Sequence, residues 1–291
     1  MADVTSLPPA RPDFIDDNPP TGFGVVDKPL RLWERLADSG VFRKAMVLLA
    51  LALAWQAYGV WLNNPLLFPT FGETVAALVT STLSGELPAA TFHSIWLLLQ
   101  GYVVGLAVAA LATAFAITTR IGADLLETLT SMFNPLPSIA LLPLAMIWFG
   151  LGEGSIIFVL VHAVLWAVAL NTHAGFRSVS TTWRMVGQNY GLSSFAYVSK
   201  ILIPGALPSI LTGLKIGWAF AWRTLIAAEL VFGVSSSGGG LGWFIFQNKN
   251  QLEIPNVFAG LLMVIIFGLL VDNCIFRVLE QRTIRRWGMQ S

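Results

Sequence analysis

The chain has 291 residues, of which 55% are hydrophobic and only 11% are charged, and its mean hydropathy is +0.70. Soluble domains carry about 25% charged residues, so this composition excludes an ordinary soluble enzyme or binding domain and indicates that lipid surrounds most of the chain. A formal net charge of +1 favours no nucleic-acid partner, and the single cysteine, Cys274, excludes an intramolecular disulfide and a thiolate metal cluster.

The first 44 residues precede the first apolar stretch. Residues 1–29 contain six prolines and no apolar core segment, so they are interpreted as a disordered tail rather than a signal peptide. Residues 30–44 place Leu32, Trp33 and Leu36 on one helical face, which predicts an interfacial amphipathic helix. The alternative for this helix is packing against the membrane-embedded domain, residues 45–288.

Six apolar stretches are long enough to cross a membrane, which takes roughly 20 residues each. No Lys or Arg occurs between Lys44 and Arg120, or between Arg120 and Arg177. The expected fold is therefore an all-α polytopic membrane protein with about six transmembrane helices, at 45–62, 92–118, 125–150, 155–176, 206–233 and 256–276.

The positions of Lys and Arg predict the orientation, because cytoplasmic loops carry an excess of these residues. With the N-terminus inside, six basic residues precede the first span, one follows the second, three follow the fourth and four follow the last. The opposite orientation would place all of these outside and is rejected. Both termini are therefore expected in the cytoplasm.

Local patterns refine this picture. Thr70 and Glu73 form a capping-box pattern that predicts a short helix in the first outside loop. Glycine pairs at 101/105 and 213/217 allow close helix contact without fixing which helices meet. The glycine-rich run 235–242 lacks the lysine of a phosphate-binding loop and is expected to be a flexible outside turn.

The third span contains Pro135, Pro137 and Pro143. Proline removes a backbone donor and clashes with the preceding turn, and broken backbone at membrane depth is tolerated only inside protein or beside a water-filled cavity. The third span is therefore expected to line a translocation path, and the alternative is a merely kinked helix.

The fifth span carries Arg223 and Glu229, with Lys215 nearer its cytoplasmic end. A charge near the bilayer centre costs about 2.5–3.5 kcal/mol, so Arg223 and Glu229 are candidates for the translocation path. A structural ion pair is the alternative. No metal site is expected, because His162 and His173 are about 16 Å apart on one helix face.

The cytoplasmic loop at about 177–205, termed the coupling loop below, carries the most specific pattern. The motif that it resembles reads Glu-Ala-Ala, three residues, Gly, nine residues, Ile-x-Leu-Pro. Here Gly191, Ile201 and Pro204 stand at the matching positions, Ile203 replaces the leucine, and Leu192 follows the glycine. Glu-Ala-Ala is replaced by Met185, Val186 and Gly187.

On these residues the chain resembles the permease subunits of ATP-binding-cassette importers, with the type I importer permease fold. Over residues 40–288 it looks like the nitrate, taurine and alkanesulfonate group; the resemblance includes the third span from Pro135 to Glu153 and the segments 203–215, 227–230 and 240–242. The resemblance implies a permease domain at 45–288 that moves a small solute, such as nitrate, taurine, a sulfonate or a carboxylate, into the cytoplasm by alternating access.

The same resemblance implies a set of partners. Two permease copies, expected to form a homodimer, lie in the bacterial inner membrane, and a periplasmic solute-binding protein delivers the solute. Two ATPase subunits bind ATP and Mg, and this chain holds no cofactor and performs no covalent chemistry. The coupling loop docks on the ATPase; Gly191 allows a turn between two short helices, and Pro204 is expected to end the second. The apolar face expected to meet the ATPase comprises Phe195, Tyr197, Val198 and Ile201.

Two other functions would also suit a polytopic membrane protein. A secondary transporter also uses broken helices and buried charges, but it would show internal duplication and an acidic ion-coupling site. The chain shows no convincing repeat, and Glu229 alone lies deep in a span. An integral membrane enzyme would need a cluster of His, Asp, Glu or Cys at site spacing, and the sequence has none.

We predict that Glu86 and Glu153 face the outside and that Arg120, Arg184 and Arg285 face the cytoplasm. Single cysteines at these positions, in a Cys274→Ser background, should react with a membrane-impermeant maleimide on intact cells at 86 and 153 alone. Labelling at 184 without labelling at 86 would overturn this orientation.

Overall fold

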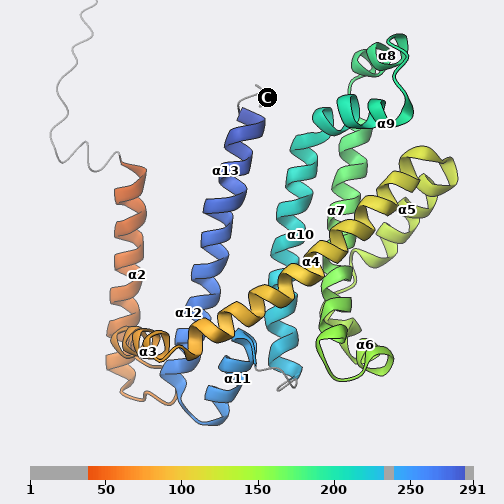
Figure 1. Ribbon diagram of the computed structural model, residues 1–291. Helices are drawn as coiled ribbons and strands as arrows, with labels where there is room; N and C mark the ends of the chain where they lie inside the picture. The colour runs from red at the N-terminus through yellow and green to blue at the C-terminus, as the bar shows by residue number, and fades with distance from the viewer. Residues whose placement is uncertain (1–38, 233–238, 286–291) are drawn as a thin grey trace, which may run out of the picture. The chain divides into compact units, whose positions relative to one another are not determined.

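The computed structural model describes residues 39–232 and 239–285 (Figure 1). Within these ranges the chain is helical and contains no strand. The α-helices are, in chain order, α2 (Gly40–Leu62), α3 (Phe71–Leu83), α4 (Glu86–Thr118), α5 (Arg120–Phe133), α6 (Leu142–Phe149), α7 (Glu153–Ser178), α8 (Thr181–Asn189), α9 (Ser194–Tyr197), α10 (Ile203–Phe232), α11 (Leu241–Asn250), α12 (Ile254–Val271) and α13 (Arg277–Glu280). A 3-10 turn precedes α6 (Ser138–Leu141), and π-helical turns occur at Val198–Leu202, Asp272–Phe276 and Gln281–Arg285.

The chain forms two compact units, residues 1–52 and 53–291, which are described separately. In the first unit, residues 40–52 are the first part of α2, and most of their side chains are exposed. The predicted tail 1–29, and residues 30–38 of the predicted interfacial helix, lie outside the described residues. The remainder of that interval, from Gly40 onward, belongs to α2 and continues directly into the first predicted span.

The expected all-α architecture with about six spans is confirmed. Among the described residues, five helices are long and apolar enough to cross a membrane, and α5 with Ser138–Phe149 adds a sixth candidate that bends by 90°. The fifth span is longer than predicted, because α9, the π turn and α10 run together from Ser194 to Val231. The last runs from Ile254 to Thr283.

The glycine pair on α4 packs against α7. A Cβ atom at Gly101 would lie 2.5 Å from the Cβ of Leu160, and one at Gly105 would lie 2.7 Å from the Cβ of Val164. Such distances are far inside van der Waals contact, so the two helices approach this closely only because glycine occupies both positions.

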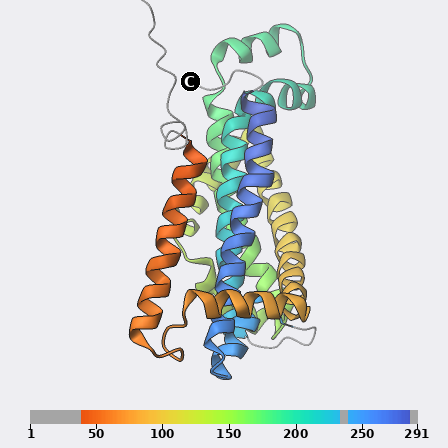
Figure 2. The same ribbon diagram turned by 90° about the vertical axis from the view of Figure 1, so that its left-hand side faces the viewer.

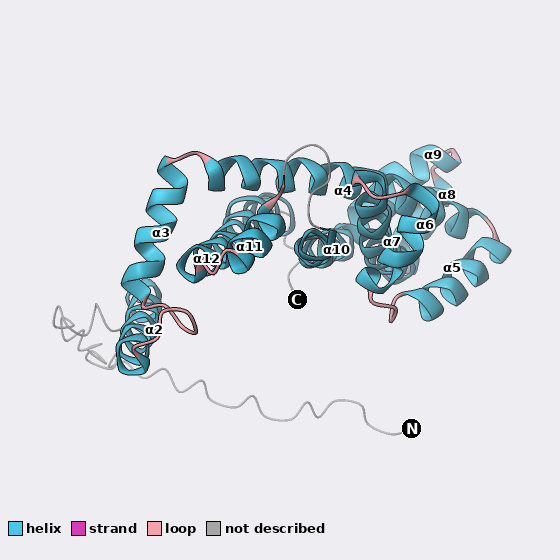
Figure 3. Cartoon of the chain, turned by 90° about the horizontal axis from the view of Figure 1, so that it is seen from below, coloured by secondary structure: helices cyan, strands magenta, loops and turns pink. Residues whose placement is uncertain are grey.

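The second glycine pair, on α10, packs against α7 as well. A Cβ atom at Gly213 would lie 2.8 Å from the Cβ of Asn171, and one at Gly217 would lie 3.0 Å from a methyl group of Val168. Seen end-on in Figure 3, α10 and α7 lie next to each other. The structure thus identifies α7 as the common partner of both glycine pairs, which the sequence alone left open.

The capping box predicted for the first outside loop is confirmed. The Thr70 hydroxyl accepts from the Glu73 N–H at 3.2 Å, and the Thr70 N–H donates to the Glu73 carboxylate at 2.8 Å. The helix that starts there, α3, lies crosswise to α10 and α12 (Figure 2). Its Ser81 hydroxyl contacts the Asn256 side-chain oxygen of α12 at 3.2 Å.

The third span is broken where its prolines predict. Helix α5 ends at Phe133, and the chain passes through Pro135 and Pro137 into the 3-10 turn before α6 begins. Proline cannot donate to the helix ladder, so neither residue can continue α5. Pro143 lies in the first turn of α6, where a missing N–H costs nothing.

Candidate functional site

A cavity of about 350 Å³ lies beside the break in the third span. It is lined by residues from the end of α5 and the following turn, from α7 and from α10. Its lining includes three of the four residues predicted for the translocation path, Pro135, Pro137 and Arg223. The structure therefore brings the broken backbone of the third span and Arg223 of the fifth to the same place.

Arg223 is the one ionisable lining residue with a permanent charge. Its side chain is exposed, and within the described residues it forms no ion pair. The carbon centre of its guanidinium lies 6.0 Å from the ring centroid of Phe220, one turn earlier on α10. A cationic fork open to a cavity can bind an anion, whereas an arginine neutralised by a carboxylate cannot do so without losing its partner.

The sequence reading did not anticipate the contribution of α7 to this cavity. His162 and Trp166, four residues apart and hence on one helix face, both line it, and His162 Nδ1 lies 3.0 Å from the Ser138 hydroxyl. The one signal in the sequence is that His162 and Trp166, a polar and an aromatic residue, share one face of the fourth span. Among the described residues, no three His, Cys, Asp or Glu side chains are grouped so that they could hold a metal ion.

Glu229, the fourth predicted path residue, lies outside the lining of this cavity. It is 4% exposed, and its carboxylate accepts from the Ser94 hydroxyl at 2.7 and 2.8 Å and from the Gly242 N–H at 2.8 Å. The Ser94 oxygen in turn accepts from the Leu241 N–H at 2.8 Å. Glu229 and Ser94 therefore accept from two of the N-terminal N–H groups of α11 and join α4, α10 and α11.

This carboxylate clamp, formed by Glu229 and Ser94, explains two glycines, Gly240 just before α11 and Gly242 in its first turn. A Cβ atom at Gly240 would overlap the Glu229 carboxylate, and one at Gly242 would lie 2.6 Å from the Glu229 Cβ. The interpretation of 235–242 as a flexible turn is therefore wrong for its end, because the backbone of residues 240–242 packs tightly on Glu229. Residues 233–238 lie outside the described part of the chain.

The coupling loop folds as two short helices joined at glycine, as predicted. Gly191, two residues after the end of α8, has φ +61°, a left-handed conformation that glycine adopts without strain. Gly187 is buried, and a Cβ atom there would lie 2.7 Å from the Tyr197 ring and 3.2 Å from Ile201. The third position of the Glu-Ala-Ala-like triplet must therefore be small for α8 to pack on the second half of the loop.

Two expectations for the coupling loop are wrong. Pro204 does not end the second helix: it lies in the first turn of α10, where its missing N–H is tolerated, and a π-helical turn leads into it. The apolar face is also largely used within the chain, because Tyr197, Val198 and Ile201 pack on a cluster formed by Phe176, Val179, Leu202 and Ala206. Phe195 alone of the predicted face stays exposed, at 85%.

Several other apolar side chains of the coupling loop are exposed on the protein surface. Trp183, Met185 and Tyr190 are exposed, and together with Phe195 they give this loop an uncovered apolar surface. Arg184, on α8, donates to the carbonyl oxygens of Val179 and Phe176 at 3.0 and 2.5 Å. The loop is thus fixed to the C-terminal end of α7 and presents aromatic side chains outward. Val186 and Leu192 are partly buried, and Ile203 is exposed.

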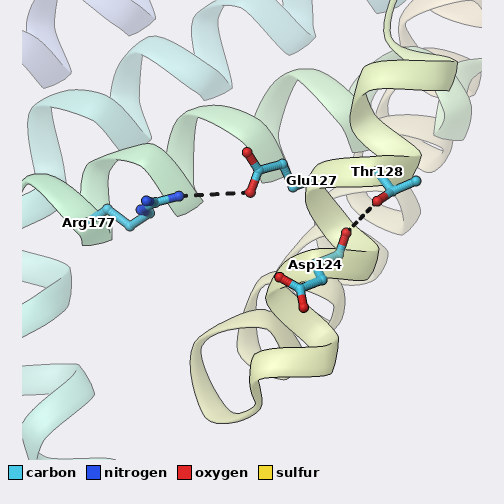
Figure 4. A network of polar contacts seen from close by, with 4 residues as sticks. All are labelled: Asp124, Glu127, Thr128 and Arg177. Carbon is cyan, nitrogen blue, oxygen red and sulfur yellow. Dashed lines mark hydrogen bonds and ion pairs between the residues drawn. The ribbon is translucent and has the colours of Figure 1, made fainter.

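Charged contacts near the coupling loop are weak. Arg177 of α7 and Glu127 of α5 lie 3.9 Å apart and are both largely exposed, while Thr128 donates to the Asp124 carbonyl at 2.7 Å (Figure 4). An exposed pair of this kind contributes about 0–1 kcal/mol. Lys215, nearer the predicted cytoplasmic end of the fifth span, pairs with Asp272 of the last span at 3.0 Å.

Comparisons with known proteins extend these observations. A family described as binding-protein-dependent transport system inner membrane component matches residues 101–285. The taurine transport system permease protein of Escherichia coli (strain K12) is 31% identical over 80% of this chain and 84% of its own length. A protein named as an aliphatic sulfonates transport permease in the same organism is 30% identical over 78% of this chain and 84% of its own length. The nitrate import permease protein of Synechocystis sp. is 35% identical over 52% of this chain and 54% of its own length.

We predict that Ser94→Ala weakens the fold through the carboxylate clamp. The substitution removes one donor from the buried Glu229 and the acceptor of the Leu241 N–H, so unfolding should become easier by about 1–3 kcal/mol. Thermal unfolding of the purified protein in detergent measures this. The matched control is Thr118→Ala on the same helix, because Thr118 is exposed and bonds only carbonyls of its own helix. Equal melting temperatures for the two variants would contradict the role of the clamp.

Proposed function

This chain belongs to the family of binding-protein-dependent transport system inner membrane components, and we propose that it moves a small oxyanion-bearing solute into the cytoplasm. The observation that carries the proposal is Arg223, which faces a cavity beside a broken span without a carboxylate partner among the described residues. The chain is a multi-pass permease subunit of the inner membrane.

The chemistry of arginine supports an anionic solute. A guanidinium is charged at all physiological pH values and offers parallel N–H donors that match the oxygens of a sulfonate, nitrate or carboxylate. The relatives named for taurine, aliphatic sulfonates and nitrate carry solutes of this chemistry. An exposed arginine with one charge would bind such a solute weakly, which suits a path that must release its cargo.

The proposed mechanism is alternating access driven by partner subunits. Two ATPase subunits would bind ATP and Mg and close on the coupling loops of two permease copies, and a solute-binding protein would deliver the solute from outside. The uncovered apolar surface of the coupling loop supports this arrangement, because exposed aromatic side chains beyond the membrane favour a protein partner. Met185, Gly191 and Leu192 would lie in or next to the contact with the ATPase.

Family membership also distinguishes this function from that of a secondary transporter or an integral membrane enzyme. The matched family comprises components of transport systems that depend on a binding protein, so it favours neither a secondary transporter nor a membrane enzyme. The buried Glu229 is already engaged by Ser94 and Gly242. It is therefore a poor candidate for an ion-coupling site.

We predict that substitution of Arg223 lowers transport without releasing the ATPase. Arg223→Ala removes both the charge and the fork and should reduce uptake by about tenfold or more, while Arg223→Lys keeps the charge and should reduce it less. Uptake of labelled taurine or nitrate, whichever the assembled transporter accepts, and co-purification of the ATPase are the measurements. Arg282→Ala removes an exposed arginine away from the cavity and should leave uptake unchanged.

A purely structural role for Arg223 gives a different result. The alanine variant would then accumulate poorly and melt earlier, and both losses would be reversed by a second substitution at an acidic residue. Such a result would contradict the proposed path.

We predict that charge on the exposed face of the coupling loop prevents ATPase binding. Tyr190→Asp and Phe195→Asp place carboxylates on residues that are 81% and 85% exposed, so the fold should be preserved while co-purification with the ATPase falls at least about tenfold. Leu83→Asp on α3, at 82% exposure, is the control and should retain the ATPase. Normal complex formation by both loop variants would show that the ATPase binds elsewhere.

A further inference from the structure

One side of the Arg223 cavity is a wall of aromatic rings. Phe133 at the end of α5 and Trp166 of α7 are stacked, with centroids 5.4 Å apart and planes 13° apart. His162 meets both rings nearly edge-on, at 6.3 Å from Phe133 and 6.1 Å from Trp166. All three side chains line the cavity, so a solute there meets a continuous aromatic surface.

Helix α10 adds the charged part of the lining. Arg223 is flanked along this helix by Phe220 and Thr224, which line the same cavity. The Ser138 hydroxyl forms a hydrogen bond with His162 Nδ1 at 3.0 Å. The cavity therefore combines one permanent positive charge with rings from three separate segments of the chain.

The size of the cavity exceeds what a small inorganic anion needs. An apolar cavity of about 150 Å³ holds a benzene molecule, and this cavity measures about 350 Å³. Nitrate has four atoms and no apolar surface, so it would occupy a small part of this space and gain nothing from the rings. A solute with an aromatic body and an anionic head would use the rings and the guanidinium together.

We propose that the Arg223 cavity recognises an organic anion with a flat aromatic body, an aryl sulfonate or aryl carboxylate, in preference to nitrate or a short alkyl sulfonate. The inference rests on the proposed function and specifies the solute class of that path. Arg223 binds the head, and Phe133 and Trp166 contact the body of the solute. Stacking and burial of the rings supply the preference, because the arginine contact is shared by every oxyanion.

The test is equilibrium binding to the purified permease–ATPase complex without the solute-binding protein. Four probes separate the contributions: benzenesulfonate, methanesulfonate, nitrate and benzylammonium. We expect benzenesulfonate to bind at least about tenfold more tightly than methanesulfonate or nitrate, and benzylammonium, which has the ring with the opposite charge, to show no binding.

Variants of the aromatic wall test whether its rings cause the preference for benzenesulfonate over methanesulfonate. Phe133→Leu, and independently Trp166→Leu, should weaken benzenesulfonate at least about fivefold and leave methanesulfonate unchanged. Phe92→Leu, which removes an aromatic ring that is exposed on α4 and absent from the cavity lining, should change neither. Because two separate ring variants are compared, poor folding of one still leaves a decisive result.

The outcomes separate this inference from the proposed function. Equal affinities for benzenesulfonate and methanesulfonate, both weakened in Arg223→Ala, would overturn the aromatic preference and leave the anion path standing. Undiminished binding of both sulfonates in Arg223→Ala would overturn the path and the preference together. Binding of benzylammonium as tightly as benzenesulfonate would show that the cavity does not select an anionic head, and would overturn the role assigned to Arg223.

Discussion

Helices α4 and α10 pack closely against α7 only because each has glycine residues at the contact. Leu160 and Val164 fill the gaps left by the glycines of α4, and Val168 and Asn171 fill those left by the glycines of α10. Interiors packed at this density do not deform gradually, so the three helices behave as one body. The positions of the cavity and the coupling loop both follow from this arrangement, since each is built partly on α7.

The middle and the C-terminal end of α7 carry the two parts of the proposed mechanism. His162 and Trp166 contribute to the cavity, and Phe176 accepts the hydrogen bond from Arg184 of the coupling loop about three turns later. A displacement of the coupling loop must therefore either break the Arg184 contacts or move α7. Helix α5, by contrast, meets α7 through stacked rings and a weak exposed ion pair, so this interface opposes sliding less than the glycine contacts do.

Sequence reasoning was strongest where one local rule applied. The proline break, the Thr70 capping box and the turn at Gly191 depend on backbone chemistry within a few residues, and the structure has all three. It failed where distant segments decide the outcome. The partners of Glu229 lie 135 residues before it and 13 after it, and no periodicity links them. The effect of Pro204 depended on the helix that follows, which accepts proline in its first turn.

The Glu229 clamp also has a consequence for biosynthesis. Membrane segments leave the ribosome in chain order, so Ser94 is already in the bilayer when Glu229 is synthesised, whereas the N–H groups of Leu241 and Gly242 do not yet exist. Until residue 242 has been added, the carboxylate has only the serine as a donor, in surroundings where a charge is costly. Helices α4, α7 and α10 can associate through their glycines before then. The junction with α11 therefore closes only after α4, α7 and α10 have been inserted, and a nascent chain that stops short of it carries a carboxyl group within the membrane that lacks one of its two hydrogen-bond donors.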